Sequence, residues 1–183
     1  VVSIIGSPNG VTSQKLGEAA RKWHSFFLNY PSPRVAVLIG GASKSHRFND
    51  SDAHALADQL RALLHEGYAL MVTTSRRTGE SQLRILQEAL QARNAFVWDG
   101  QGDNPYMGML AWADRLIVTG DSIAMLSEAC ATGKPVTMFD LGGMRDIEDE
   151  SQRDFRLGGA LYALLLRWFW RPLTRDITLV HRR

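Results

Sequence analysis

The chain has 183 residues, of which 21 are basic and 19 acidic, and its formal net charge is +2. Hydrophobic residues make up 45% and charged residues 22%, which excludes a low-complexity disordered chain. The near balance of charge argues against a protein that wraps a nucleic acid, and the single cysteine, Cys130, excludes an internal disulfide framework and a zinc site built from several cysteines.

Residues 1–33 precede the first clear strand. They start without methionine and without the basic stretch of a signal peptide, from which we expect the chain to be a piece of a longer protein. A helical pattern runs over residues 13–28, and the proline-containing stretch 30–33 then forms a stiff connector. We assign residues 1–33 to an N-terminal crossover segment with its helix.

Residues 34–150 alternate short apolar runs, rich in β-branched residues, with amphipathic helical patterns. Strands are predicted, in chain order, at 34–39, 69–73, 95–98, 116–119 and 136–139. Helices are predicted between them at 52–66, 80–92, 107–111 and 122–131. Strands that alternate with helices indicate βαβ units, so we predict an α/β fold with a mainly parallel sheet.

Residues 151–183 form a second flank. An apolar helix is predicted at 155–169, and an aromatic cluster follows at Trp168–Trp170. No uninterrupted run of about 18 apolar residues occurs in the chain, so we expect no membrane-spanning helix.

The predicted topology brings several loops together. Right-handed crossovers place the carboxyl ends of parallel strands at one edge of the sheet, and ligands of open α/β sheets bind at that edge. The loops that follow the first four strands therefore make one candidate site.

The loop after the first strand combines glycine, hydroxyl and basic residues. Glycines allow a ligand to approach the backbone closely, and free N–H groups beside hydroxyls suit phosphate oxygens. The loop lacks both the P-loop and the GxGxxG spacing, so an ordinary tight turn is the alternative. Its candidate phosphate-binding residues are Gly40, Gly41, Ser43, Lys44 and Ser45.

The second and third loops add an anion-binding group and an aromatic ring. Ser75 and Arg76, with Arg77 beside them, stand at a helix start, where a guanidinium can bind an anion through two hydrogen bonds. The alternative is a solvated, capped helix start. Trp98 can stack on a planar base, with Asn104 in the same loop, or it can cover the core instead.

The fourth loop is the most informative segment. Ser122 can cap the following helix and, with the backbone N–H groups, face a phosphate. Glu128 lies about two turns further along, within range of a ribose whose diphosphate sits at the helix start, and its carboxylate can accept hydrogen bonds from both hydroxyls. The alternative is a helix capped by Asp121 or Ser122 and a surface glutamate.

Other polar residues give weaker signals. The five histidines show no metal-ligand spacing, and only His46 lies in a strand-end loop. Cys130 falls on the apolar face of its helix and is expected in the core. Asp99 and Asp103 are too far apart for an Asp-x-Asp pattern, and no nucleophile elbow is present, so we expect no metal requirement and assign no catalytic residue.

Four segments resemble the mitochondrial-fission elongated-mitochondria family, whose bacterial members are described as predicted nucleoside-diphosphate-sugar epimerases. They are GGASKS at 40–45, TSRRTGE at 74–80, WDGQGDNPY at 98–106 and the stretch 112–136. The likeness covers most of residues 1–170. The last segment also resembles, more loosely, the donor-binding half of GT-B glycosyltransferases and the UDP-N-acetylglucosamine 2-epimerases.

The resemblance implies a Rossmann-like three-layer sandwich, the C-terminal half of a GT-B-like protein. Residues 34–150 would form its nucleotide-binding core. By analogy, the Gly40–Gly41 and Ser122 loops would face the diphosphate of a UDP-type nucleotide sugar, Trp98 the base and Glu128 the ribose, with no further cofactor. Residues 151–183 would pack toward a missing N-terminal half.

The aromatic cluster at 168–170 has two interpretations. In the first it is an exposed patch left by the missing half, through which the domain self-associates. In the second it packs internally against the 13–28 helix.

Several functions follow from these patterns. One is an enzyme domain for sugar transfer or epimerisation, in which loop N–H groups, Ser122 and Arg76 stabilise the departing diphosphate. Another is a binding or scaffold module without chemistry, peripheral to a membrane as the family name suggests. The third is a nucleotide-dependent regulator without sugar specificity. We expect a cytoplasmic location, which the single cysteine favours, with attachment at the inner membrane as the scaffold alternative.

Overall fold

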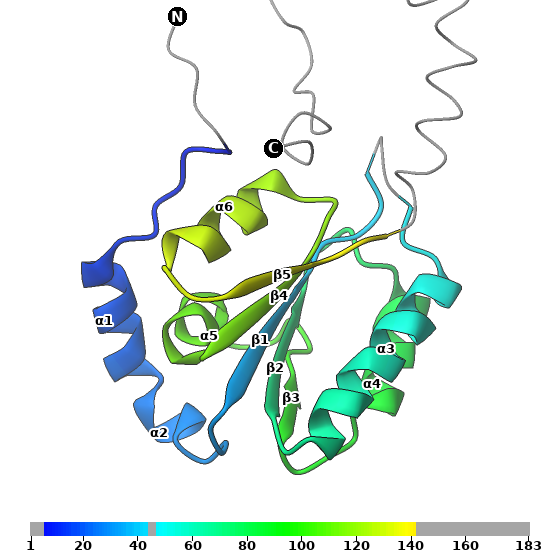
Figure 1. The fold of residues 1–183 in the computed structure, drawn as a ribbon, viewed down its shortest axis with the longest axis horizontal. Helices are drawn as coiled ribbons and strands as arrows, with labels where there is room; N and C mark the ends of the chain where they lie inside the picture. Colours follow the sequence, from blue (N-terminus) through cyan, green and yellow to red (C-terminus); the bar gives the residue numbers. More distant parts are fainter. Residues whose placement is uncertain (1–5, 44–46, 142–183) are drawn as a thin grey trace, which may run out of the picture.

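A five-stranded, all-parallel sheet forms the centre of the molecule (Figure 1). The computed structural model describes residues 6–43 and 47–141. The strands are β1 (Arg34–Ile39), β2 (Ala69–Thr74), β3 (Ala95–Val97), β4 (Arg115–Thr119) and β5 (Val136–Phe139). The predicted α/β fold with a parallel sheet is confirmed, and each predicted strand begins and ends within about one residue of the observed one.

The strand order creates a switch point in the sheet. The order is β3-β2-β1-β4-β5, so the chain moves outward from β1 through β2 to β3 and then returns to pair β4 with the other side of β1. Val37 of β1 is accordingly paired with Val72 of β2 and with Ile117 of β4. The loops after β1 and β4 leave in opposite directions, and such a point is where open α/β sheets form their ligand crevice.

Helices cover both faces of the sheet and give the predicted three layers (Figure 1). On one face lie α3 (Asp50–His65) and α4 (Glu80–Ala89), and on the other lie α1 (Ser13–Lys22), α2 (His24–Phe27), α5 (Tyr106–Trp112) and α6 (Ile123–Ala131). The side chains of β1 alternate between the two cores. Val35, Val37 and Ile39 pack with α3 and α4, whereas Ala36 and Leu38 pack with α2 and α5.

Two helical predictions need correction. The helix predicted over 13–28 is divided at Trp23, where ψ is 7°, into α1 and α2; the Trp23 indole lies over Gly108 of α5, and Phe27 is fully buried. Cys130 is exposed rather than in the core, because the buried residue of α6 is its neighbour Ala129. Successive side chains of a helix point about 100° apart, so the residue that follows a buried one can point away from the core.

The helix predicted at 155–169, the aromatic cluster at 168–170 and the domain boundary at 150 lie outside the described residues. Among residues 6–43 and 47–141, no helix combines the length and apolar character needed to cross a bilayer.

The contact between α1 and α5 can be tested with two glycine substitutions. A Cβ added to Gly108 would lie 2.5 Å from two atoms of the Trp23 ring, whereas a Cβ at Gly17 of α1 would meet nothing closer than 3.8 Å. We expect Gly108→Ala to lower the free energy of unfolding by about 1–3 kcal/mol through overpacking. Gly17→Ala should raise it by roughly 0.5–1 kcal/mol, because alanine loses less chain entropy in a helix. Denaturant unfolding measures both, and a stabilised Gly108→Ala variant would contradict this packing.

Candidate functional site

Three of the four predicted loops meet at the switch point. They are the Gly40–Gly41 turn after β1, the segment Ser75–Thr78 after β2 and the segment Thr119–Ser122, which begins with the last residue of β4. Residues more than 35 positions apart are joined there by side-chain hydrogen bonds. The convergence predicted from the alternating pattern is therefore present for these loops.

The carboxylate of Asp121 is the centre of the contacts between loops. Its side chain has 0% exposure, so its charge must be neutralised inside the protein. Asp121 Oδ2 accepts from the Gly41 N–H at 3.0 Å and from Arg77 Nη2 at 2.8 Å. Asp121 Oδ1 accepts from the Thr119 hydroxyl at 2.7 Å, whose oxygen in turn accepts from the Gly40 N–H at 2.8 Å.

The Gly40 carbonyl ties the second loop to the first. It accepts hydrogen bonds from the hydroxyls of Ser75, at 2.7 Å, and Thr78. A Cβ at Gly40 would lie 2.1 Å from Asp121 Oδ2, and a Cβ at Gly41 would lie 2.2 Å from the Arg77 carbonyl oxygen. Both glycines are therefore required by the approach of neighbouring loops, as the tight-turn alternative predicts.

These contacts change the roles available to the predicted phosphate ligands. The N–H groups of Gly40 and Gly41 are used by Thr119 and Asp121 within the protein. Arg77, whose side chain is 42% exposed, is held by Asp121 and by the Ala42 carbonyl at 3.2 Å. Arg76 is exposed, and Ser43 is half-buried near the end of the first described segment. Lys44, Ser45 and His46 lie outside the described residues.

The third loop lies at the same edge of the sheet, beyond β2. Trp98 is half-buried against the core between the sheet and α5, and its Nε1 donates to the Gln101 carbonyl at 2.9 Å. Asn104 is exposed, and its side-chain oxygen accepts from the Tyr106 N–H at 2.9 Å, where α5 begins. Trp98 therefore covers part of the core, and its indole N–H is already used.

Helix α6 connects the switch point with a second feature. Ser122 is its N-cap, and the Ser122 hydroxyl accepts from the Met125 N–H at 3.4 Å. The first N–H groups of a helix have no acceptor within it, and this end carries partial positive charge. Glu128 lies six residues further, about 9 Å along the axis at 1.5 Å per residue.

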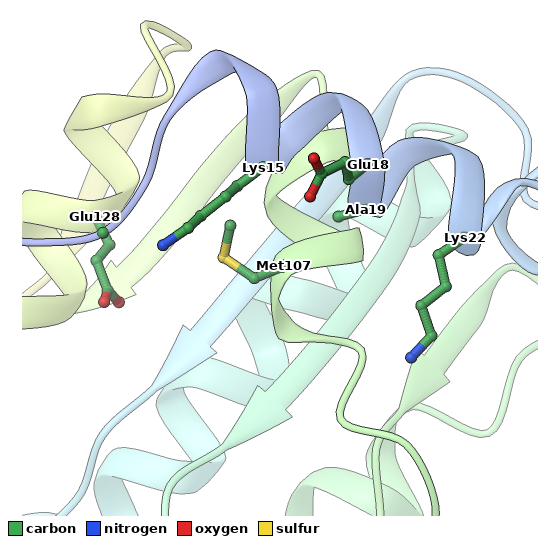
Figure 2. A pocket seen from close by; sticks show the side chains of 7 residues that line it. Lys15, Glu18, Ala19, Lys22, Met107 and Glu128 are labelled. Carbon is green, nitrogen blue, oxygen red and sulfur yellow. The ribbon is translucent and has the colours of Figure 1, made fainter.

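Glu128 lies in the wall of a pocket of about 560 Å³ between α1, α5 and α6 (Figure 2). Glu128 Oε2 accepts a 2.5 Å hydrogen bond from the Tyr106 hydroxyl at the start of α5. Burial, and then the hydrogen bond to Glu128, raise the pKa of Tyr106 well above its usual value, so the phenol keeps its proton. The remaining lining residues are Gly10, Lys15, Glu18, Ala19, Lys22 and Met107.

The charged residues of α1 place both positive and negative groups in the wall of this pocket. Lys22 is paired with Asp103 at 2.7 Å, and Glu18 accepts from the Gln14 amide at 3.0 Å. Lys15 forms no ion pair with any described residue, and Figure 2 shows its side chain extending toward the side of the pocket where Glu128 lies. Among the described residues, the pocket therefore offers one ammonium without an ion pair and two carboxylates, Glu18 and Glu128, each of which accepts a hydrogen bond from a neighbouring side chain.

The sequence did not reveal every residue of these two features. The sequence pattern predicts Asp121 only as a helix cap and places the residues of α1 in a flank without a role in the site. Tyr106 stands in the third loop, but nothing in its spacing pointed to Glu128. Within the described residues, no group of three or more His, Cys, Asp or Glu side chains is placed to hold a metal ion.

A family model described as mitochondrial fission ELM1 matches residues 1–168. The mitochondrial fission protein ELM1 of Arabidopsis thaliana is 37% identical over 137 residues, which cover 74% of this chain and 32% of that protein. An uncharacterized protein of Rickettsia prowazekii (strain Madrid E) is 32% identical over 146 residues, covering 76% of this chain and 40% of its own length. The chain thus spans only a third to two fifths of these relatives.

Solved structures overlap with the chain more loosely. The UDP-GlcNAc 2-epimerase from Neisseria meningitidis, bound to UDP-GlcNAc, is 15% identical with a TM-score of 0.47, over 67% of this chain and 35% of that one. POFUT1 in complex with GDP-fucose is 14% identical with a TM-score of 0.44, over 72% of this chain and 47% of that one. Because both TM-scores are below 0.5, the fold assignment rests on the strand order of the sheet and not on these structures.

The two neighbouring arginines provide a matched test of the buried carboxylate. Arg77→Met removes the cation that faces Asp121 and should lower the free energy of unfolding by roughly 3 kcal/mol, the lower end for breaking a buried ion pair. Arg76→Met should change it by less than about 0.5 kcal/mol, as expected for an exposed side chain. Urea unfolding of both variants measures the difference, and equal losses would contradict the central role of Asp121.

Proposed function

Since the chain belongs to the mitochondrial fission ELM1 family, we propose that it is the nucleotide-binding half of a larger GT-B-like protein. Its proposed ligand is a nucleoside-diphosphate sugar. The observation that carries this proposal is the arrangement of α6, which has its N-terminus at the switch point and Glu128 in the wall of the pocket. One helix thus offers an anion-binding end and a carboxylate about 9 Å apart.

The proposed binding mode follows the chemistry of each end. The diphosphate lies at the first turn of α6, beside Ser122 and near the exposed Arg76, where partial positive charge and a guanidinium favour an anion. The ribose lies at Glu128, whose ionised carboxylate accepts hydrogen bonds only and still has capacity beyond the one from Tyr106. Lys15 stands in the wall of the same pocket and adds a positive charge beside the ribose end of the ligand.

The reaction served by this binding is proposed at the level of its class. In sugar transfer or epimerisation, the carbon–oxygen bond between the sugar and the diphosphate is weakened or broken, and the diphosphate gains negative charge. Groups at the start of α6 and Arg76 would stabilise that charge. The other half of the protein would supply acceptor contacts, and we assign no catalytic base to this chain.

A specific observation supports the second candidate, a binding or scaffold module without catalysis. The Gly40 and Gly41 amides and much of the Arg77 guanidinium are used inside the protein, which leaves fewer donors for a departing diphosphate. The Arabidopsis relative is named for mitochondrial fission, and we propose a peripheral position at a membrane for a module of this kind.

Ligand binding by the purified chain tests the proposal. Thermal unfolding is followed while UDP, GDP, ADP and their sugars are titrated, since a ligand present at 100 times its Kd stabilises the folded state by about 2.7 kcal/mol. We expect one nucleotide class to raise the Tm. Glu128→Ala should weaken the binding of that ligand by about 1–3 kcal/mol, because charge-assisted hydrogen bonds are lost.

The matched control is Glu88→Ala, which removes an exposed glutamate of α4 on the opposite face of the sheet. It should leave the affinity unchanged. If Glu128→Ala binds as tightly as the wild type, Glu128 is not in the site. If no nucleotide raises the Tm of the chain or of the full-length protein at millimolar concentration, the nucleotide-binding function is wrong and the scaffold module takes its place.

A further inference from the structure

A hydrogen bond between Tyr106 and Glu128 fixes the position of the carboxylate in the pocket wall. Tyr106 is the first residue of α5 and Glu128 lies on α6, so their hydrogen bond crosses from one helix to the other. Both residues are half-buried, and the 2.5 Å bond joins the phenol oxygen to Glu128 Oε2. A carboxylate on a two-carbon stem otherwise has several rotamers, and this bond selects one of them.

The direction of this hydrogen bond determines which acceptor positions of Glu128 a ligand can use. The raised pKa of Tyr106 keeps the phenol protonated, so the tyrosine donates and the carboxylate accepts. An ionised carboxylate has about four lone-pair positions and no proton to give, and Tyr106 occupies one of them. Glu128 can therefore take further hydrogen bonds only from donors, and Tyr106 leaves Oε1 to them within the described part of the chain.

A vicinal diol supplies two such donors, and a 2′-deoxyribose supplies one. A site built to accept hydrogen bonds rejects an analogue that lacks the donor, because a partly buried acceptor that has lost water is then left unpaired. Discrimination of this kind depends on the orientation of the acceptor. A carboxylate that can rotate finds water or another partner, and the penalty disappears.

We propose that Tyr106 is a positioning residue that orients Glu128, and that the pair makes the pocket select a ribonucleotide over its 2′-deoxy counterpart. The inference rests on the proposed function, because it places the ribose at Glu128. Figure 2 shows the Glu128 side chain in the pocket wall, opposite the α1 residues that would face the same ligand. The selectivity thus depends on one hydrogen bond that crosses from α5 to α6.

The test is the ratio of two dissociation constants measured on the same variant. Isothermal titration gives the Kd of the best ribonucleoside diphosphate from the Tm screen and the Kd of its 2′-deoxy form. For the wild type, we expect the ribonucleotide to bind roughly tenfold or more tightly, which corresponds to about 1.4 kcal/mol. Tyr106→Phe keeps the ring and removes only the hydroxyl, so the ratio should fall to about threefold or less.

Tyr30→Phe is the matched control. It removes the hydroxyl of a partly buried tyrosine from the aromatic cluster beside α2, on the same face of the sheet but away from Glu128, and the ratio should stay at the wild-type value. A merely structural role for Tyr106 would weaken both nucleotides equally and leave the ratio intact. An unchanged ratio in Tyr106→Phe therefore overturns the inference while the proposed function stands.

The remaining outcomes separate the two claims. A wild type that binds both nucleotides equally overturns the inference alone, whereas a wild type that binds neither removes the proposed function and the inference with it. If Tyr106→Phe does not fold, Glu128→Gln is measured instead. The amide keeps one acceptor oxygen and replaces the other by an NH2 donor, so the ligand hydroxyls lose an acceptor and the ratio should fall; an unchanged ratio again overturns the inference.

Discussion

A carboxylate with no exposure to solvent needs its partners inside the protein, and Asp121 finds them on two other loops and at the end of its own strand, β4. Its oxygens accept from the Gly41 amide, the Arg77 guanidinium and the Thr119 hydroxyl. Removing any of these partners leaves a buried charge less compensated, which costs more than the bond itself contributes. The loops after β1, β2 and β4 are therefore held as a unit, and the edge of the sheet at the switch point has a fixed shape.

This unit also determines what the crevice can offer a ligand. The two glycines are there because neighbouring backbone and Asp121 come too close for a side chain, and their amides are already used. In the proposed nucleotide site, the anion is therefore assigned to the N-terminus of α6 and to the exposed Arg76. The proposed nucleotide site thus depends on α6, which brings together the switch point at one end and Glu128 about 9 Å away.

The pocket beside Glu128 exists because α1 packs on α5. Trp23 lies over Gly108 at the C-terminal end of α1, and this contact brings the charged face of α1 opposite α6. Lys134 fastens the other end of α5, since its ammonium donates to the Leu110 and Ala111 carbonyls at 2.7 Å. With Tyr106 bonded to Glu128, α5 is the element that joins α1 and α6 around one pocket.

The sequence by itself determined the alternation of strands and helices, the parallel sheet and the edge at which the loops gather, because these follow from local periodicity and the handedness of crossovers. It also identified the family, whereas the nucleotide-binding roles of Ser122 and Glu128 stay predictions. Only the tertiary structure decided that Arg77 is the arginine held by Asp121, that Cys130 is exposed, and that Tyr106 reaches Glu128. Such partners are far apart in the chain, and their distances depend on helix packing, which has no signature in local spacing.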